Sequence, residues 1–142
     1  MGKLLKLLRG EAAPAGGPRR VQGHMVELTI VGESGYQDYI RHVAQQARGG
    51  GFEIVLRPDP QNPFDSSAVV VLVDGRTDGR PVGYLPREMA RVWQPALFSA
   101  EAEGFFVVGT AQVLGGTRDK PNVGVFGSAP WPGQSPPAGR WG

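Results

Sequence analysis

The chain has 142 residues, enough for one domain with a buried core, and its 22 glycines and 13 prolines are typical of a β-rich fold with many turns. The absence of cysteine excludes disulfides, cysteine-based zinc sites and cysteine nucleophiles, and it fits a reducing, bacterial-type cytosol, so we expect a cytoplasmic protein. The net charge is +2, but residues 1–20 carry five basic residues and one acidic residue while the remainder carries ten and twelve, which excludes a broad positive field on the core.

The two ends of the chain differ in composition from its middle. Residues 1–23 join a segment of leucines and lysines to a stretch rich in glycine and proline, which predicts a basic, flexible leader and linker. No apolar run is long enough for a membrane span or a signal peptide. Residues 129–142 are rich in proline and glycine and have no periodicity, which predicts a disordered tail containing Trp131 and Trp141. The folded domain is expected over residues 24–128.

The first predicted elements of this domain are a strand and a helix. Residues 25–31 alternate apolar and polar side chains, which is the period of a half-buried strand. Ser34 and Gln37 have the spacing of a capping box, so we predict that a helix begins just after Ser34. The apolar residues that follow lie on one helical face.

Two strands, residues 52–57 and 68–73, are predicted on either side of a turn, and the second is continuously apolar, as in a strand covered on both faces. After a return strand at residues 81–85, Pro86 suits the first position of a second helix, in which Pro95 is expected to cause a kink or a break. This order of strands and helices predicts a β-rich α+β domain, and sequential antiparallel strands of this length commonly curl into a barrel, here of about six strands with two helices. The last two predicted strands are residues 105–114 and 122–127.

The sequence carries no recognisable catalytic or metal-binding motif. It has two histidines, His24 and His42, and it lacks a metal-ligand cluster, a phosphate-binding loop and the Gly-x-Ser-x-Gly motif of serine hydrolases. No spacing singles out a pair among its acidic residues. We therefore predict a non-enzymatic protein without a cofactor or a metal.

The most informative pattern is the turn Asn62-Pro63-Phe64-Asp65, which leads directly into an apolar strand. Pro63 fixes its own φ and restricts Asn62 to extended conformations, so an aromatic ring and a carboxylate stand on a rigid backbone. Other polar and aromatic residues also lie where predicted strands end or helices begin, and such ends can converge on one rim of a barrel. The candidate site residues are Tyr36, Asn62, Phe64, Asp65, Tyr84 and Arg87.

These residue types suit nucleic acid, but each also has a structural explanation. Aromatic rings can stack on unpaired bases at about 1–3 kcal/mol per base. Arg87, in the first turn of its helix, suits a phosphate, and Asp65 can accept a hydrogen bond from a hydroxyl or amino group. Asp65 can instead close the turn onto the backbone of Ser67. Gly32 is explained best by backbone shape. Asn62 can be a turn residue, and Phe64 and Tyr84 can be core side chains.

Taken together, these residues resemble the HIRAN domain. The pattern is a strand that ends in Val31-Gly32 before an aromatic residue, then a D-x-x-N-P-aromatic-D turn at residues 59–65 and an apolar strand, then Val-Gly-aromatic-Leu at residues 82–85 before a helix. The resemblance covers residues 25–114. It implies a small OB-like, modified β-barrel that binds DNA, with a site that captures the 3′ end of single-stranded DNA in the helicase-linked members.

The same resemblance implies a role for each candidate. Tyr36 and Phe64 would stack on the terminal bases, and Asn62 would help to read the end. Asp65 would accept a hydrogen bond from the terminal 3′ hydroxyl. The residues that would face bases or phosphate are Tyr84 and Arg87.

We therefore expect a non-enzymatic module that binds single-stranded DNA or DNA 3′ ends, with a role in DNA repair and a helicase or nuclease acting in trans as its partner. The alternative is a protein-interaction adaptor that uses the same aromatic rim to bind a peptide, which the excess of acidic residues beyond residue 20 favours. A hydrolase is a third alternative, for which the sequence offers neither a nucleophile nor a base.

Overall fold

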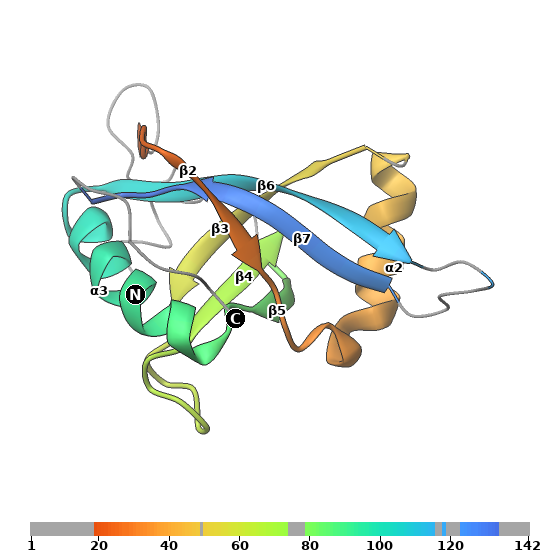
Figure 1. Cartoon of the computed structure of the whole chain (residues 1–142), viewed down its shortest axis with the longest axis horizontal. Helices are drawn as coiled ribbons and strands as arrows, with labels where there is room; N and C mark the ends of the chain where they lie inside the picture. The colour runs from red at the N-terminus through yellow and green to blue at the C-terminus, as the bar shows by residue number, and fades with distance from the viewer. Residues whose placement is uncertain (1–18, 49, 74–78, 116–117, 119–122, 134–142) are drawn as a thin grey trace.

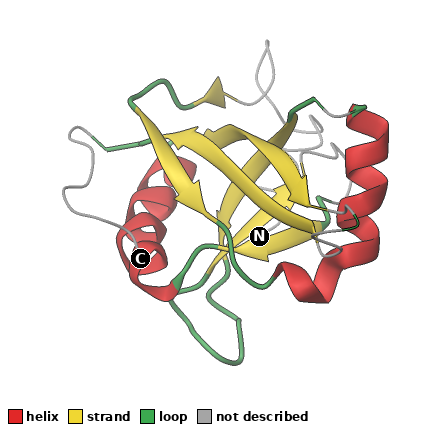
Figure 2. Cartoon of the chain, turned by 45° about the vertical axis from the view of Figure 1, so that its right-hand side comes forward, coloured by secondary structure: helices red, strands yellow, loops and turns green. Residues whose placement is uncertain are grey.

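The computed structural model of the protein describes residues 19–133 except 49, 74–78, 116–117 and 119–122. Its strands form one curled sheet, with α3 on one side and α2 on the other in both views (Figure 1 and Figure 2). The elements, in which η1 is a 3-10 helix, are β1 (Arg19–Arg20), β2 (Met25–Thr29), η1 (Glu33–Tyr36), α2 (Gln37–Ala47), β3 (Phe52–Pro58), β4 (Val69–Val73), β5 (Pro81–Tyr84), α3 (Arg87–Ala102), β6 (Phe105–Gly115) and β7 (Val123–Pro130).

The sheet has seven strands in the order β2-β7-β6-β3-β4-β5, with β1 beside β6. Neighbours along this path are antiparallel, and β1 runs parallel to β6. β2 and β5 are the two edges, yet Val31, just after β2, and Tyr84 of β5 exchange two backbone N–H···O bonds of 2.8 Å. The sheet thus curls until the ends of its two edge strands come together at this one bridge. The expected β-rich α+β class is confirmed, with one strand more than the sequence indicates because β1 joins the sheet.

Helix α3 contributes more residues to the core than any one strand. Trp93 and Leu97 on its apolar face are fully buried, and the helix packs against β3, β4 and β6. Of the two predicted effects of Pro95, a kink or a break, the break does not occur, because α3 continues through this residue. Pro95 is exposed, and so is Arg91, whose carbonyl loses its usual i+4 donor, so water can take the place of the missing hydrogen bond. Pro86 is the residue before the helix, with ψ of 152°, and not its first residue.

The sheet extends past both expected boundaries of the domain. β1 lies in the segment expected to be a leader, and β7 continues to Pro130, two residues past the expected boundary at 128. Trp131 is buried against Trp93, with ring centroids 4.9 Å apart in an edge-to-face contact. The backbone N–H of Trp131 donates to the backbone carbonyl of His24 at 2.7 Å. Residues 129–131 therefore pack with the core, whereas Trp141 lies outside the described residues.

Beyond the end of β2, side chains of η1 and α2 make hydrogen bonds to the backbone of β7. The predicted capping box is wrong, because Ser34 lies inside η1 and α2 begins only at Gln37. The Gln37 amide instead donates to the carbonyl of Val123 at 2.9 Å and accepts from its N–H at 2.9 Å. The Glu33 carboxylate accepts from the N–H of Val125 at 3.0 Å. These two side chains bond to β7 as a neighbouring strand would, and they hold η1 against the sheet.

Candidate nucleic-acid interface

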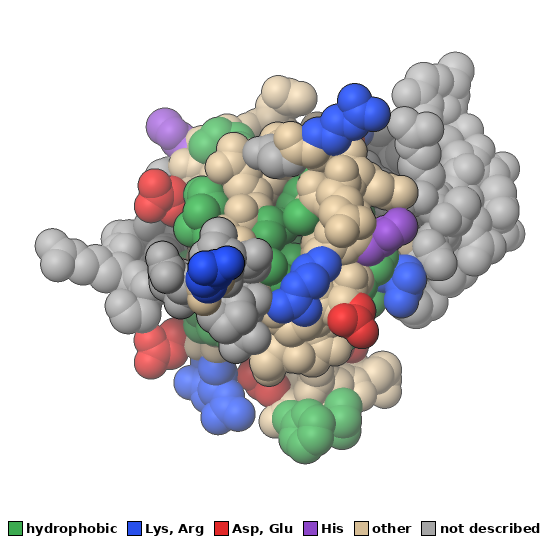
Figure 3. All heavy atoms as spheres, turned by 90° about the vertical axis from the view of Figure 1, so that its right-hand side faces the viewer, with side chains coloured by type: hydrophobic (Ala, Val, Ile, Leu, Met, Phe, Trp, Pro, Cys, Tyr) green, Lys and Arg blue, Asp and Glu red, His purple; other side chains and the backbone are tan. Residues whose placement is uncertain are grey.

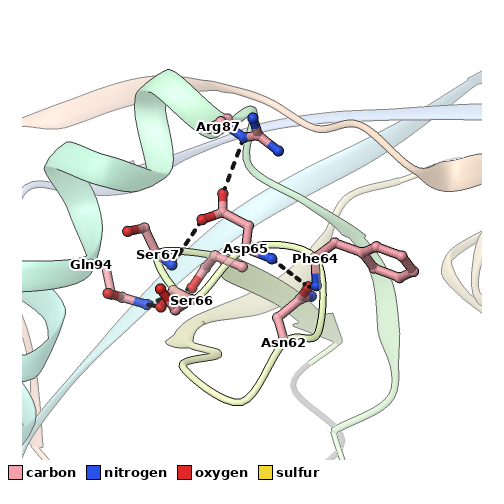
Figure 4. Close-up of polar contacts among 8 residues, drawn as sticks. Asn62, Phe64, Asp65, Ser66, Ser67, Arg87 and Gln94 are labelled. Carbon is pink, nitrogen blue, oxygen red and sulfur yellow. Dashed lines mark hydrogen bonds and ion pairs between the residues drawn. The ribbon is translucent and has the colours of Figure 1, made fainter.

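The turn between β3 and β4 is held by its own side chains (Figure 4). The Asn62 Oδ1 atom accepts from the N–H of Phe64 at 2.9 Å and from the N–H of Asp65 at 3.1 Å. Its Nδ2 atom donates to Oδ2 of Asp59 at 3.2 Å. Asn62 is therefore a turn residue, which is the structural explanation considered for it from the sequence. Its effect on a ligand comes chiefly from fixing the backbone of Phe64 and Asp65.

Asp65 connects this turn to α3. Its Oδ1 atom accepts from the N–H of Ser67 at 2.9 Å, so the predicted closure of the turn is confirmed. Its Oδ2 atom lies 3.5 Å from Nε of Arg87, the first residue of α3 (Figure 4). The Arg87 side chain is 64% exposed, and such a surface ion pair contributes about 0–1 kcal/mol. An incoming anion can therefore exchange for Asp65 at little cost.

Phe64 is not a core side chain. It is 87% exposed, and Figure 4 shows its ring directed away from the turn and from Arg87. The backbone that carries it is fixed by the Asn62 hydrogen bond and by Pro63. A large aromatic ring on a rigid support in solvent is a surface on which a planar ligand can stack.

Tyr84 lies at the bridge between the sheet edges, and it is partly buried beside Tyr36 and Asp59. Burial, together with hydrogen bonds to the hydroxyl of Tyr36 and the carboxylate of Asp59, raises the pKa of Tyr84 to about 12. The single proton of the hydroxyl goes to the Asp59 carboxylate, and the hydroxyl oxygen keeps a lone pair that can accept a hydrogen bond. Gly32, just before η1, has φ of 82°, which confirms its expected role in backbone shape.

Polar contacts link five of the six predicted side chains into one network. They run from Tyr36 through Tyr84 to Asp59, and through the turn to the ion pair at the start of α3. Phe64 belongs to the network through its backbone N–H, while its ring stands apart. Sequence reasoning did not assign Asp59 to the site, although the D-x-x-N-P motif contains it. The linked predicted residues are Tyr36, Asn62, Asp65, Tyr84 and Arg87.

Two hollows of the surface lie elsewhere. One is lined by α2, β6 and β7 and the other by β2, β6 and β7, without any of the six candidates. In the described part of the chain, no three histidine or acidic side chains are grouped as a metal site would need. The described helices include none with the length and apolar character of a membrane span.

Three comparisons relate this chain to known proteins. Residues 24–119 match the family model of the HIRAN domain. The Fanconi-associated nuclease 1 homolog of Oryza sativa subsp. japonica is 47% identical over 47 residues, which are 33% of this chain but only 5% of that protein. The crystal structure of the HIRAN domain of human HLTF aligns with a TM-score of 0.42 and 21% identity, over 75% of this chain and 74% of that one.

Proposed function

Because this chain belongs to the HIRAN domain family of DNA-binding domains, we propose that it is a non-enzymatic module that binds single-stranded DNA and recognises its 3′ end. The observation that carries this proposal is the network that joins two tyrosines, two carboxylates and a guanidinium beside an exposed phenylalanine ring. The proposed binding residues are Tyr36, Asp59, Asn62, Phe64, Asp65, Tyr84 and Arg87.

Four of these residues have a part that their geometry supports. The Phe64 ring, 87% exposed, stacks on a terminal base, at about 1–3 kcal/mol. The Oδ2 atom of Asp65, which receives no turn hydrogen bond, accepts from the terminal 3′ hydroxyl. Arg87 turns from Asp65 to a phosphate, where its guanidinium can make paired hydrogen bonds. The Tyr84 hydroxyl, whose single proton goes to the Asp59 carboxylate, accepts a hydrogen bond from an amino group of a base or from a sugar hydroxyl.

This arrangement selects the chemistry of the end. Asp59 and Asp65 place two carboxylates near the terminal sugar, and a 3′ phosphate would bring further negative charge next to them. A free 3′ hydroxyl instead gives Asp65 a donor. We expect a strand with a 3′ hydroxyl to bind at least about tenfold more tightly than one with a 3′ phosphate, which corresponds to about 1.4 kcal/mol.

The sharpest test is Asp65→Asn, because the asparagine Oδ1 atom can still accept from Ser67 and preserve the turn. Labelled single strands that end in a 3′ hydroxyl or a 3′ phosphate, and a blunt duplex, are titrated over a series of salt concentrations. Asp65→Asn should remove the preference for the hydroxyl end. Glu88→Gln, at an exposed position next to Arg87, removes the same charge and should leave the preference intact. A wild-type protein that does not distinguish the two ends would contradict end recognition.

A protein-interaction adaptor is the second candidate, and the exposure of Phe64 favours it equally. An absence of binding to any single strand would favour this candidate over DNA. For the whole protein, we propose that its partner is a DNA-processing enzyme on a separate chain, either a helicase or a nuclease. The name of the rice relative supports this, although the match spans a small part of that nuclease.

A further inference from the structure

The segment that follows the Val31–Tyr84 bridge places a second ring and a cation beside the candidate interface. Tyr36, at the end of η1, contacts Tyr84 at the end of β5. Three residues further along the chain, the ring of Tyr39 in α2 lies under the guanidinium of Arg80, with 4.4 Å from Cζ to the ring centroid. Both contacts join the η1–α2 segment to the segment from Arg80 to Tyr84. They therefore follow one another along a single seam between these two segments.

We infer that the Arg80–Tyr39 pair is a phosphate-binding subsite, which holds a single-stranded DNA beyond its terminal nucleotides. This inference rests on the proposed function, and it extends the same binding surface along the chain that leads into β5. Arg80 is exposed, and Tyr39 is partly buried. Figure 3 faces the side of the molecule that carries α2, and it shows separate basic side chains there among acidic and polar ones, without a continuous basic patch. The phosphates of a single-stranded DNA that crosses this face must therefore bind to individual basic side chains.

The position of the guanidinium suits a phosphate. Its Cζ atom lies over the Tyr39 ring, and the N–H groups that are not directed at the ring can make paired hydrogen bonds with phosphate oxygens. The ring also restricts the arginine side chain before DNA arrives, so less conformational entropy is lost on binding than for an arginine that is not stacked. This separates Arg80 from a cation that only adds to the general charge.

The spacing sets the length of DNA that reaches the subsite. Arg80 precedes Tyr84 by four residues, which is about 13 Å at the strand rise of about 3.3 Å per residue. At about 3.4 Å per nucleotide in a stacked strand, this distance corresponds to at most about four nucleotides. A dinucleotide bound in that conformation at the Tyr84 end falls short of Arg80, whereas a longer strand reaches it.

The test compares a dinucleotide with an oligomer of about ten nucleotides, both with a free 3′ hydroxyl, on the full chain. Arg80→Ala should weaken binding of the oligomer about five- to tenfold at low salt and change dinucleotide affinity less than about twofold. The slope of log K against log salt should fall by about 0.7, the value for one phosphate of a single strand. The control Arg20→Ala removes the same charge in β1, which pairs with the beginning of β6 and lies away from α2 in Figure 1. It should show no dependence on strand length.

Tyr39→Leu gives a second readout, because it keeps an apolar contact and the charge of Arg80 but removes the stacking plane. It should weaken oligomer binding about two- to threefold with the salt slope unchanged. Equal losses for the short and the long strand, or an unchanged slope in Arg80→Ala, would overturn the subsite and leave end recognition standing. If the wild-type protein binds no single strand at all, the proposed function and this inference both fail.

Discussion

Replacing Trp131 by alanine should lower the free energy of unfolding by about 4 kcal/mol. The side chain is 8% exposed, and its ring meets that of Trp93 at 84° with centroids 4.9 Å apart. Burying an aromatic side chain removes about 150–250 Å² from water, which at about 25 cal/mol per Å² amounts to about 4–6 kcal/mol. Trp131 lies just past the end of β7, where the surroundings can partly relax. The expected loss is therefore at the lower end, within the range of about 3–5 kcal/mol typical of Trp→Ala in a core.

The assay is urea unfolding followed by far-UV circular dichroism, since tryptophan fluorescence would itself change with the substitution. A loss of about 4 kcal/mol is a large part of the stability of a small domain, about 5–15 kcal/mol, so the midpoint should move strongly while the m-value stays constant. The N–H of residue 131 can still donate to the carbonyl of His24, so the measured loss reports the side chain. Phe98→Ala, at a ring 47% exposed on α3, is the control and should cost less than about 1 kcal/mol.

A loss below about 1 kcal/mol for Trp131→Ala would refute the reasoning. Residues after 128 would then contribute little to the core, and the domain boundary expected from composition would describe the protein better.

Two further predictions concern the core. Burial raises the pKa of Glu101 to about 7, an effect that Arg57 only partly offsets, so the folded state holds this proton more tightly than the unfolded chain. The protonated Glu101 therefore adds to the free energy of unfolding below pH about 4.3, and this contribution, at most about 3–4 kcal/mol, is lost as the pH rises to about 7. In urea unfolding at several pH values, Glu101→Gln should reduce the dependence of the unfolding free energy on pH. Gly83→Ala would place a Cβ atom 2.6 Å from Cγ2 of Ile30, beside the bridge between the sheet edges, and should cost about 1–3 kcal/mol in thermal unfolding. Gly35→Ala, where a Cβ atom meets nothing within 4 Å, should change stability far less.

Two features that depend on neighbouring residues, the strand β4 and the closure of the turn, are predicted well, whereas the capping box at Ser34 is not. The continuous apolar run of β4 indicates a strand on composition alone. The bond from the N–H of Ser67 to Asp65 joins groups two residues apart, so turn chemistry is sufficient to predict it. The β-rich α+β class follows from the order of such local elements.

Contacts between distant segments are the ones that sequence reasoning misses. The local bond from Asn62 connects Asp59 to the turn, but its contact with Tyr84 comes from another strand, and no spacing along the chain indicates that contact. Trp131 stands in a stretch of prolines and glycines, where a composition window gives a single ring little weight, yet α3 provides a buried partner for it. The break expected at Pro95 fails for a similar reason, since tertiary packing of the helix outweighs the missing hydrogen bond.

The pairing of β2 with β7 has a consequence for how the chain is made. Met25 pairs with Pro130, so the first long strand finds its described ladder partner only in the last strand of the sheet. At synthesis rates of about 5–20 residues per second, the ribosome needs about 5–20 seconds to reach that partner after β2 has emerged. During this interval β2 is an unpaired edge, open to pairing with other nascent chains, and such a delay is where a chaperone would have most effect on yield.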